Sequence, residues 1–293
     1  MKKKTLLCLF LFLVFSSTIY FSFIKRTKGF CLKKAVSFHS YNSLWDIGPP
    51  TPEQLQLLDY LSTQSFYELG SGIQCFAFVS EDGEYVIKFF KQNHMRAKSL
   101  IDRLPLPPPL KTIRNDRINK RFVLRKKSFT NFCFAYENFK NESALLFLHL
   151  NPTKYIKKKI VFYNKRGKAF RLDLDNMEFV IQKRLKPIFP KINSLMTKGK
   201  IEKAQTLIAS IFDHLEIRSL QGIGDTDSNC RNNLAVLKNN IITLDVGELY
   251  QRPSRPATFD EYLLATKDLQ KWLDTNYPDL GVFLKNQLEM RKK

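Results

Sequence analysis

Short apolar runs separated by turn residues predict several β-strands in the first two thirds of the chain. Two or three such runs lie between Tyr67 and Phe90, where the dipeptide Asp82-Gly83 is typical of a hairpin turn. Further strands are expected in the ranges Lys159–Tyr163, Ala169–Leu174 and Met177–Leu185, which are separated by Lys-Arg-Gly and Asp-Asn turns. Together these runs predict a five-stranded antiparallel sheet.

Apolar residues at helical spacing predict helices elsewhere. One is expected from Phe134 to Leu150, where Asn151-Pro152 ends it. Thr258 as N-cap and Glu261 three residues later form a capping box, which predicts a helix through residue 273. The run Thr51-Pro52-Glu53-Gln54 predicts the cap of a short helix that extends to about Ser62. Other helices are expected at about 200–220 and 278–290, with a hinge at 186–187.

The N-terminal pattern is different, because residues Thr5 to Ile24 include no charged side chain and are rich in Leu, Phe, Val and Ile. Twenty such residues in a helix would span a hydrocarbon core of roughly 30 Å. A cleaved signal peptide is the alternative, although no Ala-x-Ala-like site follows the apolar run. The sequence thus predicts a membrane anchor within residues 1–30, and basic residues on both flanks weakly favour a cytoplasmic globular part.

A glycine-containing turn precedes a lysine on an apolar strand. Gly70 and Gly72 would allow backbone N–H groups to approach phosphate, and Lys88 would offer one ammonium to the same ligand. An ordinary β-meander with a strand lysine is the alternative interpretation, because two glycines at this spacing are a weak signal.

Three oxygen-bearing side chains follow in the last third of the chain. Asp227 precedes Asn232 by five residues, and Asp245 ends the apolar run 241–244 beyond a predicted hairpin. Phosphoryl transfer needs one carboxylate to orient the attacking hydroxyl, and an amide and a second carboxylate to hold magnesium. Asp227, Asn232 and Asp245 are therefore candidates for such a cluster.

The order of these elements resembles the protein-kinase-like superfamily: a glycine turn, a strand lysine, Asp-x4-Asn, a hairpin, and then Asp-x-Gly at Asp245 to Gly247. The resemblance implies that ATP and Mg²⁺ are cofactors. It also implies Asp227 as the catalytic group and Asn232 with Asp245 as the metal ligands. It also implies a helix glutamate that pairs with Lys88. Glu142, nine residues before Asn151, is expected in that role, with Glu137 as the alternative.

The chain departs from the family pattern at several positions. Cys75 replaces the third glycine of the loop, Asp225-Thr226 replaces the usual His-Arg pair, and valine replaces the phenylalanine of Asp-Phe-Gly. Asn233 competes with Asn232 for the metal role, and Asp225 competes with Asp227. These departures leave a pseudokinase, a scaffold or interaction module without catalysis, as the alternative function.

The resemblance implies an α+β, two-lobed, protein-kinase-like fold with a five-stranded antiparallel N-lobe sheet and a reduced helical C-lobe, preceded by one transmembrane helix. The expected parts are residues 1–30 as anchor, with the helix at about 5–24, and residues 31–63 as juxtamembrane segment with a short helix. Residues 64–186 are expected as N-lobe, with a basic Pro-rich insertion at about 103–127, and residues 187–293 as C-lobe. An atypical or small-molecule kinase fits these lengths better than a protein kinase.

Composition adds a strong positive charge, because 48 Lys and Arg residues face 27 Asp and Glu residues for a formal charge of +21. Basic clusters lie at 111–127 and 154–168, and anionic lipid headgroups are a candidate partner for them. A basic membrane-associated effector with accidental kinase resemblance is a further alternative. Nucleic acid is an unlikely partner because no DNA- or RNA-binding module is recognisable. The five cysteines form no Cys-x-x-Cys pair, which argues against a zinc site.

Overall fold

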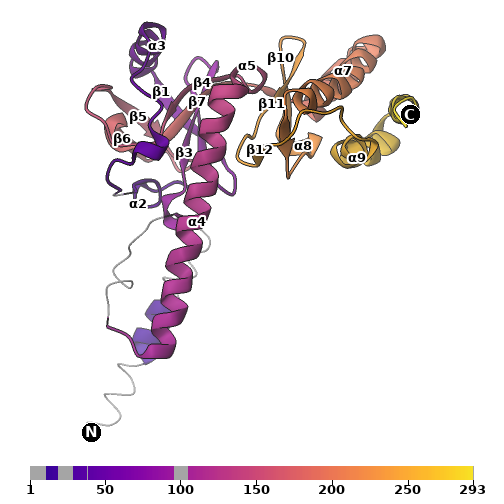
Figure 1. Ribbon diagram of the computed structural model, residues 1–293. Coiled ribbons are helices and arrows are strands. Elements are labelled where there is room, and N and C mark those ends of the chain that lie inside the picture. Colours follow the sequence, from indigo (N-terminus) through magenta and orange to yellow (C-terminus); the bar gives the residue numbers. More distant parts are fainter. Residues whose placement is uncertain (1–10, 19–28, 38, 96–104, 293) are drawn as a thin grey trace.

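The computed structural model describes residues 11–18, 29–37, 39–95 and 105–292 (Figure 1). Two parts are visible: a sheet lobe formed by residues 29–183, and a helical lobe formed by residues 186–292. A single seven-stranded sheet with the order β4-β7-β3-β2-β1-β5-β6 forms the centre of the sheet lobe. Its strands are β1 (Ser65–Ser71), β2 (Cys75–Ser80), β3 (Tyr85–Phe90), β4 (Leu145–His149), β5 (Lys159–Tyr163), β6 (Ala169–Asp173) and β7 (Phe179–Lys183).

The predicted five-stranded antiparallel sheet is wrong in both number and direction. The sheet has seven strands, and β1 pairs with β5 in parallel. One additional strand is β4, which pairs with β7 where a helix was expected. The run from Leu145 to His149 is apolar almost throughout, so its pattern fits a strand that is buried on both faces as well as a helix.

The core of the sheet lobe is rich in phenylalanine. Phe66, Phe78, Phe89 and Phe162 are fully buried, and the rings of Phe89 and Phe162 meet edge to face with centroids 4.9 Å apart. These residues alternate with more exposed ones along β1 and β5, which places one face of those strands in the core. Helix α3 (Pro52–Ser62) covers this core with Leu58 and Leu61, and its predicted cap at residue 51 is confirmed as a full capping box.

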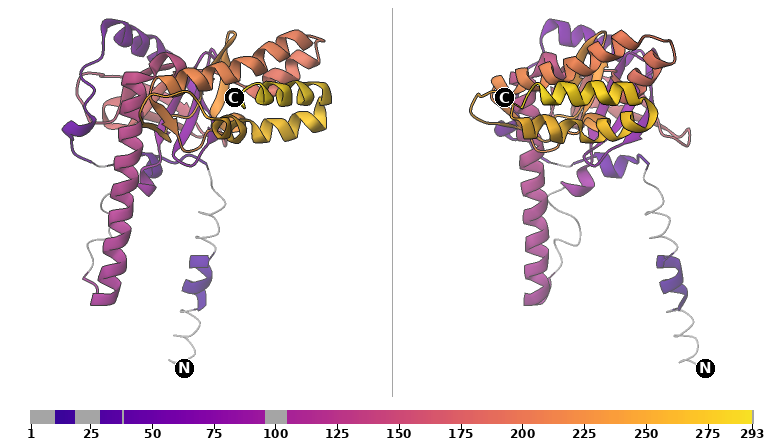
Figure 2. Two further views of the ribbon diagram at one scale, coloured as in Figure 1. Left: turned by 45° about the vertical axis from the view of Figure 1, so that its right-hand side comes forward. Right: turned by 90° about the vertical axis from the view of Figure 1, so that its right-hand side faces the viewer.

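The longest helix, α4 (Pro108–Asn138), includes residues 108–127 of the segment predicted as a basic insertion and ends earlier than the predicted helix. It begins with Pro108 and Pro109, which are compatible with the first helical turn, and it has no glycine or proline after them. Its C-terminal half packs on the sheet, since Phe129 and Phe132 contact the ring of Phe90. Its N-terminal half extends beyond the body of the sheet lobe in every view (Figures 1 and 2).

The helical lobe has a separate hydrophobic core. Its long elements are α6 (Ile188–Met196), α7 (Ile201–Leu220), α9 (Phe259–Asn276) and α10 (Pro278–Glu289). Short strands accompany them: β8 (Lys186–Pro187), β9 (Ile223–Asp225), β10 (Leu234–Leu237), β11 (Asn240–Thr243) and β12 (Leu249–Gln251). The hairpin β10-β11 was predicted, and so was the capping box of α9 between Thr258 and Glu261. Short helices elsewhere are α2 (Leu32–Ala35), α5 (Lys140–Ser143), α8 (Cys230–Asn233), and the 3₁₀ turns Ser43–Trp45, Gln92–His94 and Leu174–Asn176.

A third apolar cluster joins the two lobes. Phe90 and Phe129 of the sheet lobe share it with Ile223, Val246 and Leu249, which flank the loops of the helical lobe. Helix α4 therefore packs against both the sheet and the segment that follows β11. This shared packing fixes the strand that carries Lys88 relative to the loop that carries Asp245.

The predicted membrane anchor is corrected by the structure. Across the described ranges, no helix is long and apolar enough to cross a membrane. Of the predicted span, the structure describes residues 11–18, which are helical. The rest of the predicted span, residues 5–10 and 19–24, lies outside the described residues. This finding contradicts the predicted single-pass topology, and the cytoplasmic placement depended on that topology.

Candidate functional site

Lys88 extends from the sheet lobe to the helical lobe. It lies on β3, half-buried, and its Nζ donates a hydrogen bond to the carbonyl oxygen of Leu244 at 2.8 Å. Gln182, on the neighbouring strand β7, approaches the same carbonyl with its Nε2 at 3.4 Å. Leu244 directly precedes Asp245, so the strand lysine and the Asp-x-Gly turn meet at this point.

Asp245 is exposed at the start of a tight turn. Its Oδ1 accepts the N–H of Gly247 at 3.0 Å, and the carbonyl oxygen of Gly247 accepts Asn131 Nδ2 from α4 at 2.8 Å. A Cβ at position 247 would stand 2.4 Å from Oε1 of Gln74, in the glycine turn of the sheet lobe. The Asp-x-Gly turn is therefore enclosed by α4 on one side and by the glycine turn on the other.

Glu248 continues this set of contacts. It accepts hydrogen bonds from Lys127 Nζ at 2.7 Å and from Thr226 Oγ1 at 2.7 Å, and Gln74 Nε2 lies 3.4 Å from its other oxygen. Burial opposes ionisation of the Glu248 carboxyl, but the bonds from Lys127 and Thr226 outweigh it and lower the pKa. The single carboxylate of Glu248 thus contacts the glycine turn, α4 and the loop after β9.

Cys75, where the family pattern has glycine, lies beside these groups. Burial raises the pKa of its thiol to about 12, while the nearby charge of Lys88 lowers the pKa and that of Asp245 raises it. Cys75 is therefore a neutral thiol at physiological pH and not an activated nucleophile.

Asp225 and Asp227 have opposite environments although only one residue separates them. Asp225 Oδ2 accepts Arg218 Nη1 at 2.8 Å in a buried ion pair, and its Oδ1 accepts the N–H of Asp227 at 2.9 Å. Burial raises the pKa of the Asp225 carboxyl, and the charge of Arg218 partly offsets the effect. The Asp227 residue is exposed. The structure therefore gives Asp225 a role in holding the loop and leaves the Asp227 carboxylate available to a ligand.

The two candidate amides, Asn232 and Asn233, also differ in burial. Asn232 is exposed, whereas Asn233 is buried and its Nδ2 donates to the carbonyl oxygen of Asp227. The backbone of Asn233 accepts the N–H of Leu244 at 2.7 Å, which ties the loop to the end of β11. Asn233 is thus the amide that is held between Asp227 and the strand leading to Asp245.

The two candidate glutamates do not pair with Lys88. Among the described residues, no salt bridge joins Lys88 to Glu142, Glu137 or another carboxylate. Glu142 lies on α5, where its Oε1 accepts Gln221 Nε2 at 3.2 Å, and it lines a different cavity beside His214. Because the apolar run after it forms β4, Glu142 stands at a helix–strand junction and not inside a helix that faces Lys88.

The glycine turn is closed in this conformation. Gly72 N–H donates to the carbonyl oxygen of Cys75 at 3.0 Å, and Gly72 carbonyl accepts Lys91 Nζ. Gly70 follows a register shift in β1, and a Cβ there would meet nothing within 4 Å. Neither glycine has a positive φ, so the backbone conformation at these two positions does not itself require glycine.

The oxygen donors suit a hard cation. Within the described residues, no group of three or more His, Cys, Asp or Glu side chains could hold a metal ion by itself. The carboxylate of Asp245 and the amide oxygen of Asn233 or Asn232 are, however, oxygen donors of the kind that Mg²⁺ takes when substrate phosphates complete its shell. The residues fit such an ion in donor type.

Sequence reasoning missed three groups of this site: Gln74, Lys127 and Asn131. All three contact the Asp-x-Gly segment across lobes, and the two on α4 were assigned to an insertion or to no element. A signal was present, because no glycine or proline interrupts the chain between Pro109 and the predicted helix.

Comparison with known proteins finds only distant structural similarity. No protein-family model matches the chain, and no curated protein matches its sequence. Two structures of WbdD, described as a bifunctional kinase-methyltransferase, are similar at 14% and 13% identity with TM-scores of 0.37 and 0.35. Rv3197 from Mycobacterium tuberculosis, solved with erythromycin, is similar at 14% identity with a TM-score of 0.32.

The matches are partial in length. They cover 74% of this chain against 42% and 44% of the WbdD chains, and 83% of this chain against 61% of Rv3197. The chain therefore spans less than half the length of WbdD. These matches identify no activity and no ligand for this chain.

Proposed function

We propose that this chain is a kinase-like protein that binds Mg-ATP between its sheet lobe and its helical lobe. The contact between Lys88 Nζ and the carbonyl oxygen of Leu244, 2.8 Å long, is the observation that carries the proposal. It brings the strand lysine to the residue before Asp245, as a site that clamps a metal-bound polyphosphate requires.

Each group then has a distinct task. Lys88 would leave the Leu244 carbonyl and donate to phosphate oxygens, and the glycine turn would open so that its N–H groups can do the same. Asp245, with Asn233 or Asn232, would hold Mg²⁺, which would neutralise charge on the phosphates. Asp227 would accept the proton of an acceptor hydroxyl, because its carboxylate is exposed in the loop between the two lobes.

A nucleotide-binding or nucleotide-free pseudokinase is the second candidate. One observation favours it: among the described residues, Lys88 has no carboxylate partner and its ammonium is engaged by backbone. In catalytic kinases a helix glutamate normally keeps that lysine in position. In this chain, α4 offers Asn131 and Lys127 to the Asp-x-Gly segment instead.

The decisive experiment is thermal denaturation of the full-length chain with and without Mg-ATP. A ligand at ~100 times its Kd should add about 2.7 kcal/mol to the free energy of unfolding. Lys88→Met should abolish this gain and leave the melting temperature of the free protein nearly unchanged. Lys183→Met is the matched control, because Lys183 lies on the neighbouring strand β7 with its ammonium over the Tyr85 ring.

The outcome separates the candidates. A gain in wild type and in the Lys183 variant, but not in the Lys88 variant, supports the proposed site. An equal gain in all three proteins places nucleotide elsewhere, and no gain in any of them favours the nucleotide-free candidate.

A further inference from the structure

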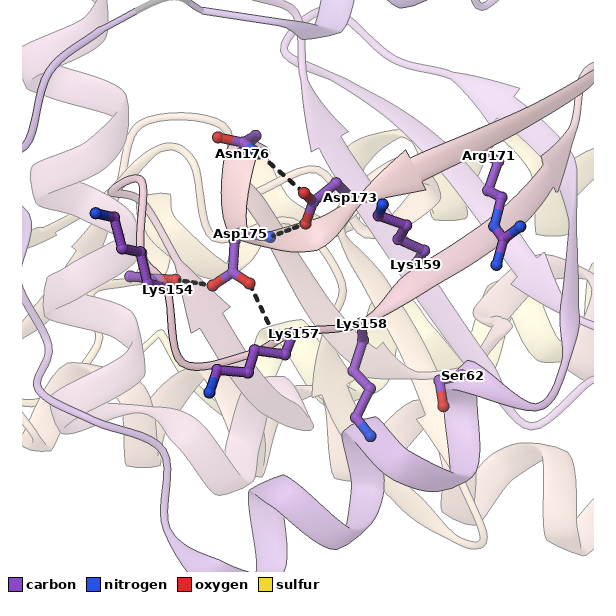
Figure 3. Close-up of a pocket in the computed structure, with 10 residues that line it drawn as sticks. Ser62, Lys154, Lys157, Lys158, Lys159, Arg171, Asp173, Asp175 and Asn176 are labelled. Atoms are coloured by element: carbon purple, nitrogen blue, oxygen red, sulfur yellow. Dashed lines mark hydrogen bonds between the residues drawn. The ribbon is translucent and has the colours of Figure 1, made fainter.

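A basic cavity of about 660 Å³ lies in the sheet lobe, away from the candidate site (Figure 3). It is formed by the loop before β5, by β6 and by the end of α3, at the edge of the sheet opposite β4. Five cationic side chains line it: Lys154, Lys157, Lys158, Lys159 and Arg171. None of its lining residues belongs to the site that contains Lys88.

The acidic residues of the cavity are engaged by the protein itself. Asp175 accepts Thr153 Oγ1 at 2.5 Å and the N–H groups of Ile156 and Lys157 at 3.1 and 2.7 Å. Asp173 accepts Asn176 Nδ2 at 3.1 Å and the N–H of Asp175 at 3.2 Å (Figure 3). Both carboxylates are therefore already hydrogen-bonded to protein groups.

These bonds also shape the loop that presents the lysines. Lys157 has a φ of 51°, a left-handed conformation that lysine rarely adopts. The Asp175 carboxylate holds it there through two successive N–H groups, so the backbone of the loop is fixed before any ligand arrives. Such strain is typical of functional loops, since the surrounding structure must stabilise it.

The cationic side chains have little internal compensation. Lys158 is paired with Asp59, but in the part of the chain that the structure describes no salt bridge includes Lys154, Lys157, Lys159 or Arg171. The cavity therefore carries five cations against the two carboxylates of Asp173 and Asp175, and this excess of positive charge favours binding of an anion. The cavity volume lies within the range of small-molecule sites, roughly 300–1,000 Å³.

We propose that this cavity binds a ligand carrying two or more phosphate groups, either a free polyphosphate compound or the headgroup of a phosphorylated lipid. The ligand would be held by Lys154, Lys157, Lys159 and Arg171, independently of nucleotide at the site between the lobes. The Asp175 carboxylate positions the loop and does not contact the ligand.

The test measures binding of inorganic tripolyphosphate by calorimetry, and sedimentation with phosphatidylcholine vesicles with and without phosphatidylinositol 4,5-bisphosphate. Both use the full-length chain carrying Lys88→Met, without magnesium, so that the site between the lobes does not contribute. The cavity variant combines Lys154→Ser, Lys157→Asn and Lys159→Ser, with asparagine at 157 because it tolerates the left-handed conformation.

The matched control combines Lys191→Ser, Lys198→Ser and Lys203→Ser. These three lysines line another cavity, on α6 and α7 of the helical lobe, so the same charge is removed at a different place. Three lysines near a phosphate-rich ligand are together worth about a hundredfold in affinity. We expect the cavity variant to lose about that factor and the control to stay within about twofold of the parent.

Arg171→Gln keeps the test decisive if the triple variant unfolds. Arg171 is exposed on β6, and its replacement should weaken binding about threefold without lowering the melting temperature. Binding of tripolyphosphate alone would assign a soluble ligand, and binding of the phosphorylated-lipid vesicles alone would assign a headgroup. Equal losses in the cavity variant and the control, or no binding of either probe to the parent, would overturn the proposal.

Discussion

The two sides of the loop after β9 differ in the burial and pairing of their carboxylates. On the inner side, Asp225 is buried, paired with Arg218 and bonded to the loop backbone. On the outer side, Asp227 and Asp245 are exposed, and the described contacts of Asp245 go to its own turn. The comparison teaches that charge on the inner side builds the loop, whereas charge on the outer side is available to a ligand.

The largest expected effect comes from breaking the inner side. Arg218→Met leaves the Asp225 carboxylate buried without its cation, which should lower the free energy of unfolding by about 3–5 kcal/mol. Chemical denaturation with circular dichroism measures this loss. The double variant Arg218→Met with Asp225→Asn removes both charges and should recover a large part of it.

The same variant should show a distinctive pH dependence. Burial raises the pKa of Asp225 in the folded protein, so stability linked to this group is fully present below its ordinary pKa and is lost as the pH rises through the folded value. Removing Arg218 raises the pKa of Asp225 in the folded protein further. The pH range over which the stability linked to Asp225 changes then extends to higher pH. A loss from Arg218→Met that does not change with pH would contradict a buried, unpaired carboxylate at 225.

The next effect concerns the outer side. Asp245→Ala should change the free energy of unfolding of the free protein by no more than about 0.5 kcal/mol, because the side chain is exposed. It should lose the part of the nucleotide stabilisation that depends on magnesium, up to about 2.7 kcal/mol at ~100 times Kd. Thermal denaturation with ATP, with and without magnesium, measures both.

Asp227→Ala is the control for this experiment. It removes a second exposed carboxylate nearby and should keep magnesium-dependent binding while abolishing any ATP turnover. If both variants bind Mg-ATP like wild type, the outer carboxylates have no part in the site. If wild type binds Mg-ATP without turnover, the pseudokinase alternative is supported.

Local patterns predicted much of this molecule, because local forces decide those parts. The hairpin β10-β11, the caps at residues 51 and 258, and the strand that carries Lys88 all follow from residues close together in the chain. Asp227 and Asp245 were expected near each other for the same reason. One short hairpin separates their loops, and it leaves few ways to arrange them.

What could not be predicted depends on packing between distant segments. The run at 145–149 is a strand only because β7 lies beside it, and its conversion moves Glu142 away from Lys88. Asn232 and Asn233 are neighbours of identical chemistry, and only the fold decides which is buried. The contacts of Lys127 and Asn131 with the Asp-x-Gly segment span more than a hundred residues, beyond any local pattern.

The smallest expected effect comes from a second ion pair on the inner side, between Arg252 and Glu261. Arg252 donates to Glu261, to Ser219 Oγ at 2.6 Å, and through its N–H to the carbonyl oxygen of Gly222 at 2.8 Å. Burial opposes ionisation of Glu261, but hydrogen bonds from Arg252, Thr258 and Arg255 outweigh it and lower the pKa from 4.5 to about 2.

A lowered folded pKa means that the stability from Glu261 is present above the unfolded value near 4.5 and is lost as the pH falls towards 2. The carboxylate is partly exposed, so solvent screening reduces its contribution to about 1 kcal/mol. Glu261→Gln should therefore cost about 1 kcal/mol at neutral pH and flatten the decline of stability between pH 5 and pH 2. Asp260→Asn is the matched control, since Asp260 lies exposed in the same helical turn. An equal cost for both variants would show a general helix-terminus effect, and the inner side would then depend on the pair of Arg218 and Asp225 alone.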